Sequence, residues 1–187
     1  MIKRATSALA ICLGLAVAVA RADEAKIPAV GDKAPDFTLE DLDGQSVSLE
    51  KLKPDAPVVL VVLRGYPGYQ CPICSFQVSN LLKHAEDFKS AGAQVVLVYP
   101  GPADDLDARA AEFIKGKSLP DNFAFVTDPG YEFTNAYGLR WDAPRETAYP
   151  STFVIGTDGN VRFAKVSKTH GGRANTAKVL EALSGGK

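Results

Sequence analysis

The sequence predicts a single α/β domain in which helices flank a mixed β-sheet. Apolar, β-branched runs of strand length alternate along the chain with segments of helical periodicity, which is typical of parallel strands joined by helices. The last of these segments before the closing helix form a hairpin pattern, which adds antiparallel strands to the sheet. The chain of 187 residues is long enough for one domain with a sizeable core and too short for two ordinary ones.

The first 22 residues are predicted to be a secretory signal peptide and not part of the fold. Two basic residues precede an apolar run from Ala8 to Ala20, and small residues follow it, as in cleavable leaders. The run is short for a membrane span, so we expect no stable membrane insertion after cleavage, although an uncleaved anchor is the alternative. We expect an exported protein, periplasmic or secreted, with a polar tether at 23–30 and the domain at 31–187.

The overall charge argues against a nucleic-acid partner. Lysine and arginine together number 21 against 22 aspartates and glutamates, the formal net charge is −1, and no basic stretch occurs. Proteins that bind nucleic acids usually carry a basic patch or stripe. The composition therefore indicates a soluble domain of another functional class.

The domain is predicted to open with a β-hairpin and a buried strand. Two short strand-like pieces, Phe37–Leu39 and Ser46–Leu49, enclose the turn signal Asp43-Gly44. The apolar run Ala56–Leu63 then has the length and composition of a buried parallel strand. A loop rich in glycine and proline, Arg64–Gly68, ends it.

A helix is predicted next, and it carries two cysteines at its start. Apolar residues recur with helical spacing from Cys74 to Phe88. Pro72 suits the first helical position, where its missing N–H group is no loss, so Cys71 should lie near the N-cap and Cys74 in the first turn. Free N–H groups and the helix dipole at this end favour a thiolate over a thiol. Arg64 could add positive charge from the preceding loop.

The second half of the chain continues the alternation of strands and helices. Acidic residues in the first turn and lysines in the last predict a helix at 104–117, and Gly138 ends a second helix. An Asp-Gly turn separates the last two strands. The expected elements are a strand at Ala93–Tyr99, a helix at Asp104–Lys117, a strand at Phe123–Thr127, a helix at Tyr131–Tyr137, a hairpin of Thr152–Ile155 and Val161–Val166, and a helix at Ala174–Leu183.

The segment Cys71-Pro72-Ile73-Cys74 carries the chemistry. The sequence has three cysteines, and the third, Cys12, lies in the predicted leader, so a mature chain keeps only this pair. Two thiols at this spacing can pass two electrons by closing and opening a disulfide. Because exported compartments oxidise thiols, the pair is either a stable disulfide or is kept reduced by a dedicated donor.

A metal site at the pair is disfavoured, and no metal or other cofactor is expected. Zinc normally takes four ligands, and only His84 and His170 could join Cys71 and Cys74. His84 lies about 15 Å along the predicted helix from Cys74, too far to share a metal. His170 has the sequence context of a solvated turn residue. A structural disulfide clip or a soft-metal site remains as the non-catalytic alternative.

Two further segments carry a family resemblance. The opening Gly31–Leu39 with Asp43-Gly44, and Asp128-Pro129 with Ala136–Leu139, occur in the order found in thioredoxin-like proteins of the peroxiredoxin branch, the alkyl hydroperoxide reductase and thiol-specific antioxidant type. The chain resembles this family from about residue 31 to about residue 166. The resemblance implies a thioredoxin-like fold and a thiol-based antioxidant activity.

The match to the family's active site is partial. Peroxiredoxins carry Pro-x-x-x-Thr-x-x-Cys, and the spacing sets Pro67 on the proline, Cys71 on the threonine and Cys74 on the peroxidatic cysteine. A thiol thus replaces the hydroxyl that helps to hold the peroxide. The family's arginine, which shares that task, precedes the strand that resembles 152–155, and Pro150 occupies its place.

Pro150 also belongs to a segment that resembles a thioredoxin loop. The segment Tyr149–Phe153 resembles the loop that carries the cis-proline of thioredoxins, which packs against their dithiol. A cis bond persists where tight geometry demands it, and an ordinary trans proline that opens a strand is the alternative. Arg140 and Arg145 lie nearby in sequence and are the candidates to replace the missing arginine. Pro67, Pro72, Pro150 and Arg64 are therefore the expected supporting residues.

These features leave two enzymatic hypotheses. In the leading one the protein exchanges disulfides with protein partners, with Cys71 as an exposed nucleophile and Cys74 as the resolving thiol. In the other, Cys74 is oxidised by hydrogen peroxide or an alkyl hydroperoxide to a sulfenic acid, and Cys71 condenses with it. Both require an external thiol or disulfide protein partner, such as a thioredoxin-like donor or substrate.

Overall fold

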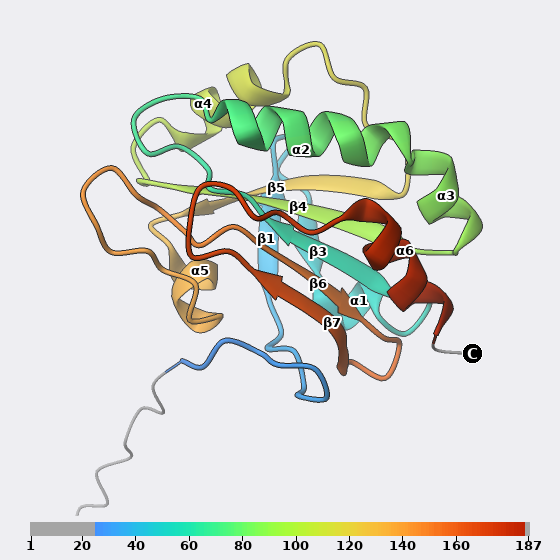
Figure 1. The fold of residues 1–187 in the computed structure, drawn as a ribbon. Helices are drawn as coiled ribbons and strands as arrows, with labels where there is room; N and C mark the ends of the chain where they lie inside the picture. Colours follow the sequence, from blue (N-terminus) through green and yellow to red (C-terminus); the bar gives the residue numbers. More distant parts are fainter. Residues whose placement is uncertain (1–24, 186–187) are drawn as a thin grey trace, which may run out of the picture.

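Seven β-strands form one mixed sheet in the computed structural model, which describes residues 25–185. The sheet order is β2-β1-β5-β4-β3-β6-β7 (Figure 1). The strands are β1 (Thr38–Asp41), β2 (Ser46–Ser48), β3 (Val58–Val62), β4 (Gln94–Gly101), β5 (Phe123–Pro129), β6 (Ser151–Ile155) and β7 (Val161–Val166). The strands β3, β4 and β5 run parallel, whereas β6 and β7 at one side and the β1–β2 hairpin at the other are antiparallel. The predicted mixed sheet and N-terminal hairpin are confirmed.

Helices cover both faces of the sheet. The helices α2 (Pro72–Lys83), α3 (Ala85–Ser90), α4 (Leu106–Ile114) and α6 (Thr176–Ser184) contribute to the apolar cluster on one face. The short helices α1 (Leu49–Leu52) and α5 (Glu132–Ala136) contribute to the cluster on the other. Within residues 25–185, no helix combines the length and apolar character that crossing a bilayer requires.

The central strand β3 is buried on both sides. Val59 and Val61 pack into the cluster that contains the two cysteines, while Val58, Leu60 and Val62 pack into the opposite cluster. All five side chains are fully buried. A strand covered on both faces has no polar side to alternate with, which explains its continuous apolar sequence.

Most predicted boundaries differ from the structure by one to three residues, and two differences change the element to which a residue belongs. The predicted helix through Phe88 is interrupted at His84, whose φ of −103° and ψ of 18° end α2 before α3 begins. The N–H group of His84 bonds to the carbonyl oxygen of Leu81, three residues back, so the last turn tightens there. The predicted strand through Leu49 ends one residue earlier, because Leu49 begins α1. His84 therefore lies at the end of α2 and not within a longer helix.

A glycine sets the path from β3 to the cysteines. Gly65 has a φ of +70°, and a Cβ atom there would lie 1.8 Å from the carbonyl oxygen of Pro100 on β4. That oxygen accepts a hydrogen bond from the N–H group of Tyr66, at 3.0 Å. The loop thus lies directly against the end of β4, which fixes where α2 starts.

The N-terminal segment of the described chain lies on the domain. Pro28 is buried, and the N–H group of Gly31 bonds to the carbonyl oxygen of Val161 at 2.8 Å. The predicted signal peptide falls outside the described residues, as do the first two positions of the predicted tether at 23–30.

Candidate dithiol site

The two cysteines occupy the predicted positions at the start of α2. Cys71 is the N-cap residue, Pro72 is in the first turn, and the N–H group of Cys74 donates to the sulfur of Cys71 at 3.4 Å. Both cysteines are free thiols. Cys71 retains 3% exposure and Cys74 none. The expectation of an exposed Cys71 is therefore wrong: Cys71 packs into the apolar cluster on this face of the sheet, and only an edge of it reaches the surface.

The two thiols differ strongly in acidity. A hydrogen bond from the Cys74 side chain is the main cause that lowers the pKa of Cys71, to about 5, against the opposing effect of burial. The same bond and burial raise the pKa of Cys74 well above its ordinary value. The N–H group of Cys74 and the charges of Arg173 and Arg64 add to the stabilisation of a Cys71 thiolate. The pair therefore holds one negative charge, centred on Cys71, and one proton on Cys74.

An arginine from a distant segment contacts the second thiol. Nη2 of Arg173, in the loop before α6, lies 3.5 Å from the sulfur of Cys74. Its charge acts to lower the pKa of both cysteines. Sequence reasoning missed this residue, because 99 positions separate it from Cys74 and no motif surrounds it.

The two arginines suggested by sequence do not reach the thiols. Main-chain carbonyl oxygens of Trp141, Glu146 and Thr147 hold the guanidinium of Arg140. Arg145 is exposed, and its own carbonyl oxygen accepts a hydrogen bond from another arginine. The expectation that one of them replaces the family's arginine is wrong, since the loop that carries them uses Arg140 to hold its own backbone.

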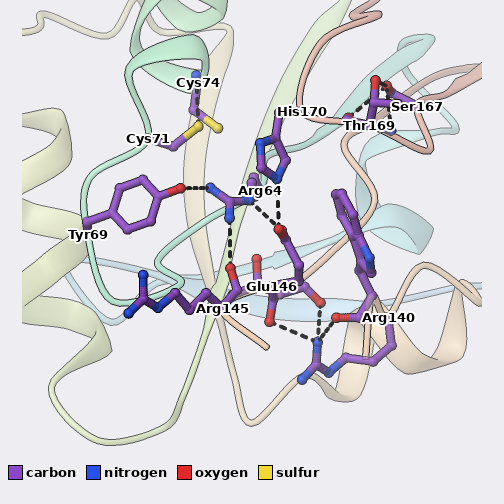
Figure 2. Close-up of polar contacts among 12 residues, drawn as sticks. Arg64, Tyr69, Cys71, Cys74, Arg140, Arg145, Glu146, Ser167, Thr169 and His170 are labelled. Atoms are coloured by element: carbon purple, nitrogen blue, oxygen red, sulfur yellow. Dashed lines mark hydrogen bonds and ion pairs between the residues drawn. The ribbon is translucent and has the colours of Figure 1, made fainter. Parts of the chain in front are cut away.

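Arg64 is buried below the dithiol, and each of its three guanidinium nitrogens has a bonded partner (Figure 2). Its Nε lies 2.6 Å from Oε2 of Glu146, Nη1 donates to the hydroxyl of Tyr69 at 2.5 Å, and Nη2 donates to the carbonyl oxygen of Arg145 at 2.7 Å. Burial opposes the charge of Arg64, yet the bonds to Glu146 and Tyr69 outweigh it and raise the pKa of Arg64. Arg64 thus joins the loop before α2 to the loop before β6.

His170 extends this network to a third loop. Its Nε2 lies 2.7 Å from Oε1 of Glu146, and its ring lies 5.4 Å from that of Trp141. Ser167 shapes the loop by donating to the carbonyl oxygen of Thr169 at 2.9 Å (Figure 2). His170 is half exposed in a bend, as expected for a solvated turn residue, and it is also bonded to Glu146, which was not predicted. Glu146 was not predicted, because its partners are remote in sequence.

The three prolines have different positions. The peptide bonds of residues 25–185 include no cis bond, so the expected cis form of Pro150 is wrong and the trans alternative is correct. Pro150 is buried directly before β6, and its carbonyl oxygen accepts a hydrogen bond from Ser167 at 2.9 Å. Pro72 is exposed at the start of α2, and Pro67 is half-buried in the preceding loop.

The histidines do not join the cysteines. Nδ1 of His84 bonds to Asp87 at 2.8 Å, and His170 bonds to Glu146. Within residues 25–185, no three or more His, Cys, Asp or Glu side chains are grouped so that they could hold a metal ion.

Known proteins similar to this chain are thiol enzymes. The AhpC/TSA family model matches residues 30–164. The chain is 32% identical over 155 residues to chloroplastic peroxiredoxin Q of Oryza sativa subsp. japonica, covering 82% of this chain and 67% of that protein. It is 27% identical over 131 residues to the thiol-disulfide oxidoreductase ResA of Halalkalibacterium halodurans, covering 70% and 65%. The crystal structure of a putative thiol:disulfide interchange protein DsbE from Chlorobium tepidum matches with a TM-score of 0.61 and 26% identity, over 83% and 99% of the two chains.

Proposed function

The chain belongs to the AhpC/TSA family, and from this premise we propose that its dithiol exchanges disulfides with protein partners. The general class of the protein, a thiol-based oxidoreductase with a thioredoxin-like fold, follows from the family and from its relatives. The relatives include a peroxiredoxin and a thiol-disulfide oxidoreductase by name. The choice between these two activities rests on the different pKa values and the different burial of Cys71 and Cys74.

Cys71 has the properties of the attacking thiol. Its pKa is lowered, so it is ionised at neutral pH, and it alone of the pair touches the surface. Cys74 is sealed from solvent and keeps its proton. Because the thiolate is the reactive form, a partner disulfide meets Cys71 first.

The exchange then proceeds in two balanced steps. The Cys71 thiolate attacks one sulfur of the partner disulfide, a mixed disulfide forms, and the partner's other sulfur leaves as a thiolate that takes up a proton. Cys74 then loses its proton and attacks the Cys71 sulfur, which releases the partner as a dithiol. Two electrons have passed from the pair to the partner, and the reverse sequence would oxidise a partner dithiol. Arg173 stabilises the thiolate that develops on Cys74.

Peroxide reduction is the second candidate, and the contact between Arg173 and Cys74 favours it. Cys74 would take one oxygen from a hydroperoxide, form a sulfenic acid and release an alcohol or water. Cys71 would then condense with the sulfenic acid to a disulfide and release water. The raised pKa and complete burial of Cys74 weigh against this order of events.

Trapping the mixed disulfide tests the proposal. In Cys74→Ser the first step can occur and the second cannot, so a covalent complex between Cys71 and a disulfide-containing protein should accumulate. In Cys71→Ser no complex should form. A Cys71→Ser variant that still reduces disulfides at the wild-type rate would refute the assignment. Stopped-flow oxidation by hydrogen peroxide at the rate of an ordinary free thiol would exclude the peroxidase.

We also propose that the protein acts after export. This proposal is supported by the leader pattern of residues 1–22 alone. Amino-terminal sequencing of the protein from the producing cell checks it: a mature end at Asp23 is expected, and an intact amino terminus would contradict it.

A further inference from the structure

The charge of Arg173 has no carboxylate to balance it. Among residues 25–185, none of the ion pairs includes Arg173, and the only hydrogen bond of its side chain runs from Nη2 to the sulfur of Cys74, at 3.5 Å. Nε and Nη1 are buried and have no partner in this part of the chain. Arg64, in contrast, has Glu146 at 2.6 Å. The dithiol is therefore the only anionic partner that the described residues give to Arg173.

The main chain on both sides of Arg173 is fixed. Before it, the N–H group of Ser167 donates to the carbonyl oxygen of Pro150 at 2.9 Å. After it, the side chain of Asn175, the N-cap residue of α6, accepts a hydrogen bond from the N–H group of Ala177 at 2.9 Å. Because both sides are held and two of the three guanidinium nitrogens are enclosed, Arg173 stays beside the sulfurs when their charge changes.

The dithiol also lies where helix starts favour an anion. Cys71 is the N-cap residue of α2, and its sulfur accepts a hydrogen bond from the N–H group of Cys74 at 3.4 Å. Arg173 lies two residues before Asn175, which begins α6. The positive end of a helix dipole favours an anion and disfavours a cation. A guanidinium at this place is therefore unfavourable on its own, and a thiolate next to it relieves the repulsion.

Oxidation of the pair removes that anion. The reduced pair carries one negative charge, because the pKa of Cys71 is lowered to about 5, whereas a disulfide is neutral. Arg173 keeps its charge on oxidation, since arginine is not deprotonated in proteins, and it loses its partner. A buried charge without a partner is unfavourable. The surroundings therefore favour the reduced pair, and a couple whose reduced form is stabilised is a strong oxidant.

We propose that Arg173 stabilises the reduced form of the pair over the disulfide, so that the protein is an oxidant whose substrates are dithiols of other polypeptides. The inference rests on the proposed disulfide exchange and gives that exchange a direction. It assigns to Arg173 an effect on the equilibrium, beyond the stabilisation of the thiolate that forms on Cys74 within one step. A partner that leaves the reaction carries a new disulfide.

The oxidation of a partner is balanced in atoms and electrons. A partner thiolate attacks the Cys71 sulfur of the disulfide, and the Cys74 sulfur leaves as a thiolate next to Arg173. The partner's second thiolate then attacks the partner sulfur in the mixed disulfide and releases the Cys71 thiolate. The partner dithiol loses two electrons and two protons, of which Cys74 takes one proton and water the other. A small disulfide such as oxidised glutathione restores the pair by the same exchange and leaves as two thiols.

The equilibrium with glutathione measures the effect of Arg173. The protein is brought to equilibrium at pH 7 with different ratios of reduced to oxidised glutathione, and alkylation followed by mass spectrometry counts the free thiols. In Arg173→Met, the equilibrium constant for reduction of the pair by glutathione should be about tenfold lower, the size of the effect of one hydrogen bond to a charged group. For two electrons this is a potential about 30 mV lower. Arg173→Lys keeps the charge and should recover part of the difference.

Lys178→Gln is the matched control. It removes the same charge from an exposed position on α6, where water and salt screen it, so the equilibrium constant should change little. Equal constants for the wild type and Arg173→Met would overturn the proposed role of Arg173. A change in Lys178→Gln as large as that in Arg173→Met would also overturn it.

Unfolding in urea separates this role from a structural one. In the unfolded chain the guanidinium and the sulfurs are hydrated, so surroundings that favour the reduced pair make the reduced protein more stable than the oxidised one. The wild type should therefore unfold at a higher urea concentration when reduced, and in Arg173→Met this gap should narrow. A purely structural role would lower both forms equally, so an unchanged gap would overturn the proposal. A wild type that is more stable when oxidised would overturn the proposed direction.

The proposed function and this inference can fail separately. Cys74→Ser traps a mixed disulfide only if the pair exchanges disulfides with proteins, whereas the glutathione equilibrium needs no protein partner. If no mixed disulfide accumulates, the proposed function fails, yet a tenfold lower constant in Arg173→Met still supports the stabilisation by Arg173. If the mixed disulfide accumulates and the constants of the wild type and Arg173→Met are equal, the proposed function stands and the role of Arg173 is overturned.

Discussion

Substituting Glu146 by glutamine should destabilise the domain far more than its position in a loop would suggest. The carboxylate lies 2.6 Å from Arg64, and the two side chains are 10% and 3% exposed. Glutamine keeps the size of the side chain and removes the charge. The other acceptors of Arg64, the hydroxyl of Tyr69 and the carbonyl oxygen of Arg145, carry no full negative charge. The variant therefore leaves a buried cation whose remaining hydrogen-bond partners are neutral.

The expected loss is large because the remaining charge is not hydrated. Removing one partner of a buried ion pair costs about 3–5 kcal/mol. A Coulomb energy of about 4 kcal/mol, for charges 4 Å apart at an effective dielectric constant of 20, is of the same size. For a domain of this length each kcal/mol moves Tm by about 2–4 °C. Tm should therefore fall by roughly 6–20 °C.

The pH dependence has a defined sign. Burial opposes the ionisation of Glu146, but the bonds from Arg64 and His170 outweigh it and lower its pKa. A carboxylate with a lowered pKa contributes stability above its ordinary value of about 4.3, and this contribution disappears as the pH falls through the lowered pKa. The difference between the wild type and Glu146→Gln should thus be full at pH 7 and should shrink in acid.

Urea unfolding of the reduced protein, followed by circular dichroism at several pH values, measures this difference. The matched control is Glu50→Gln, which removes the same charge from an ion pair with Lys53 in which Glu50 is 65% exposed. The control should lose less than about 1 kcal/mol, as exposed pairs do. If Glu146→Gln loses no more than this control at pH 7, the buried network does not stabilise the fold and the reasoning is refuted.

Two further predictions concern the dithiol and the loop before it. Cys74→Ala removes the hydrogen-bond donor that lowers the pKa of Cys71, whereas Cys74→Ser keeps a donor, so the midpoint of the pH profile for Cys71 alkylation should be about one pH unit higher in Cys74→Ala; identical midpoints would contradict this account. Gly65→Ala should prevent stable folding, because the new Cβ meets the Pro100 carbonyl oxygen, while Gly116→Ala, with a similar φ of +75° and open space, should cost only about 1–2 kcal/mol. Denaturant unfolding distinguishes them, and similar losses at both glycines would show that the close contact is unimportant.

Local patterns predicted most of the fold. The continuous apolar run of β3, the hairpin turn signals and the proline after Cys71 act over a few residues, and the structure confirms what they indicate. The dithiol's position at a helix start was predicted for the same reason. The break between α2 and α3 was missed, because the apolar spacing continues past His84 although the backbone does not.

The surroundings of the dithiol could not be predicted in this way. Arg173 reaches Cys74, and Glu146 reaches Arg64, only after the sheet has brought three loops together. The two members of such a pair are far apart in the sequence, and no fixed spacing between them indicates the contact. The expectation for Pro150 failed differently: the local sequence resembles a thioredoxin loop, but the isomer depends on packing that a short resemblance does not specify.

Trp141 gives this protein a native optical probe. It is the only tryptophan of the chain, its ring stacks on Tyr149 with centroids 4.9 Å apart, and it lies next to His170. His170 and Arg173 share one loop, so a displacement of that loop during turnover alters the environment of a single fluorophore. Stopped-flow emission can therefore follow the loop in unlabelled protein, on the same sample and timescale as the chemistry at the two sulfurs.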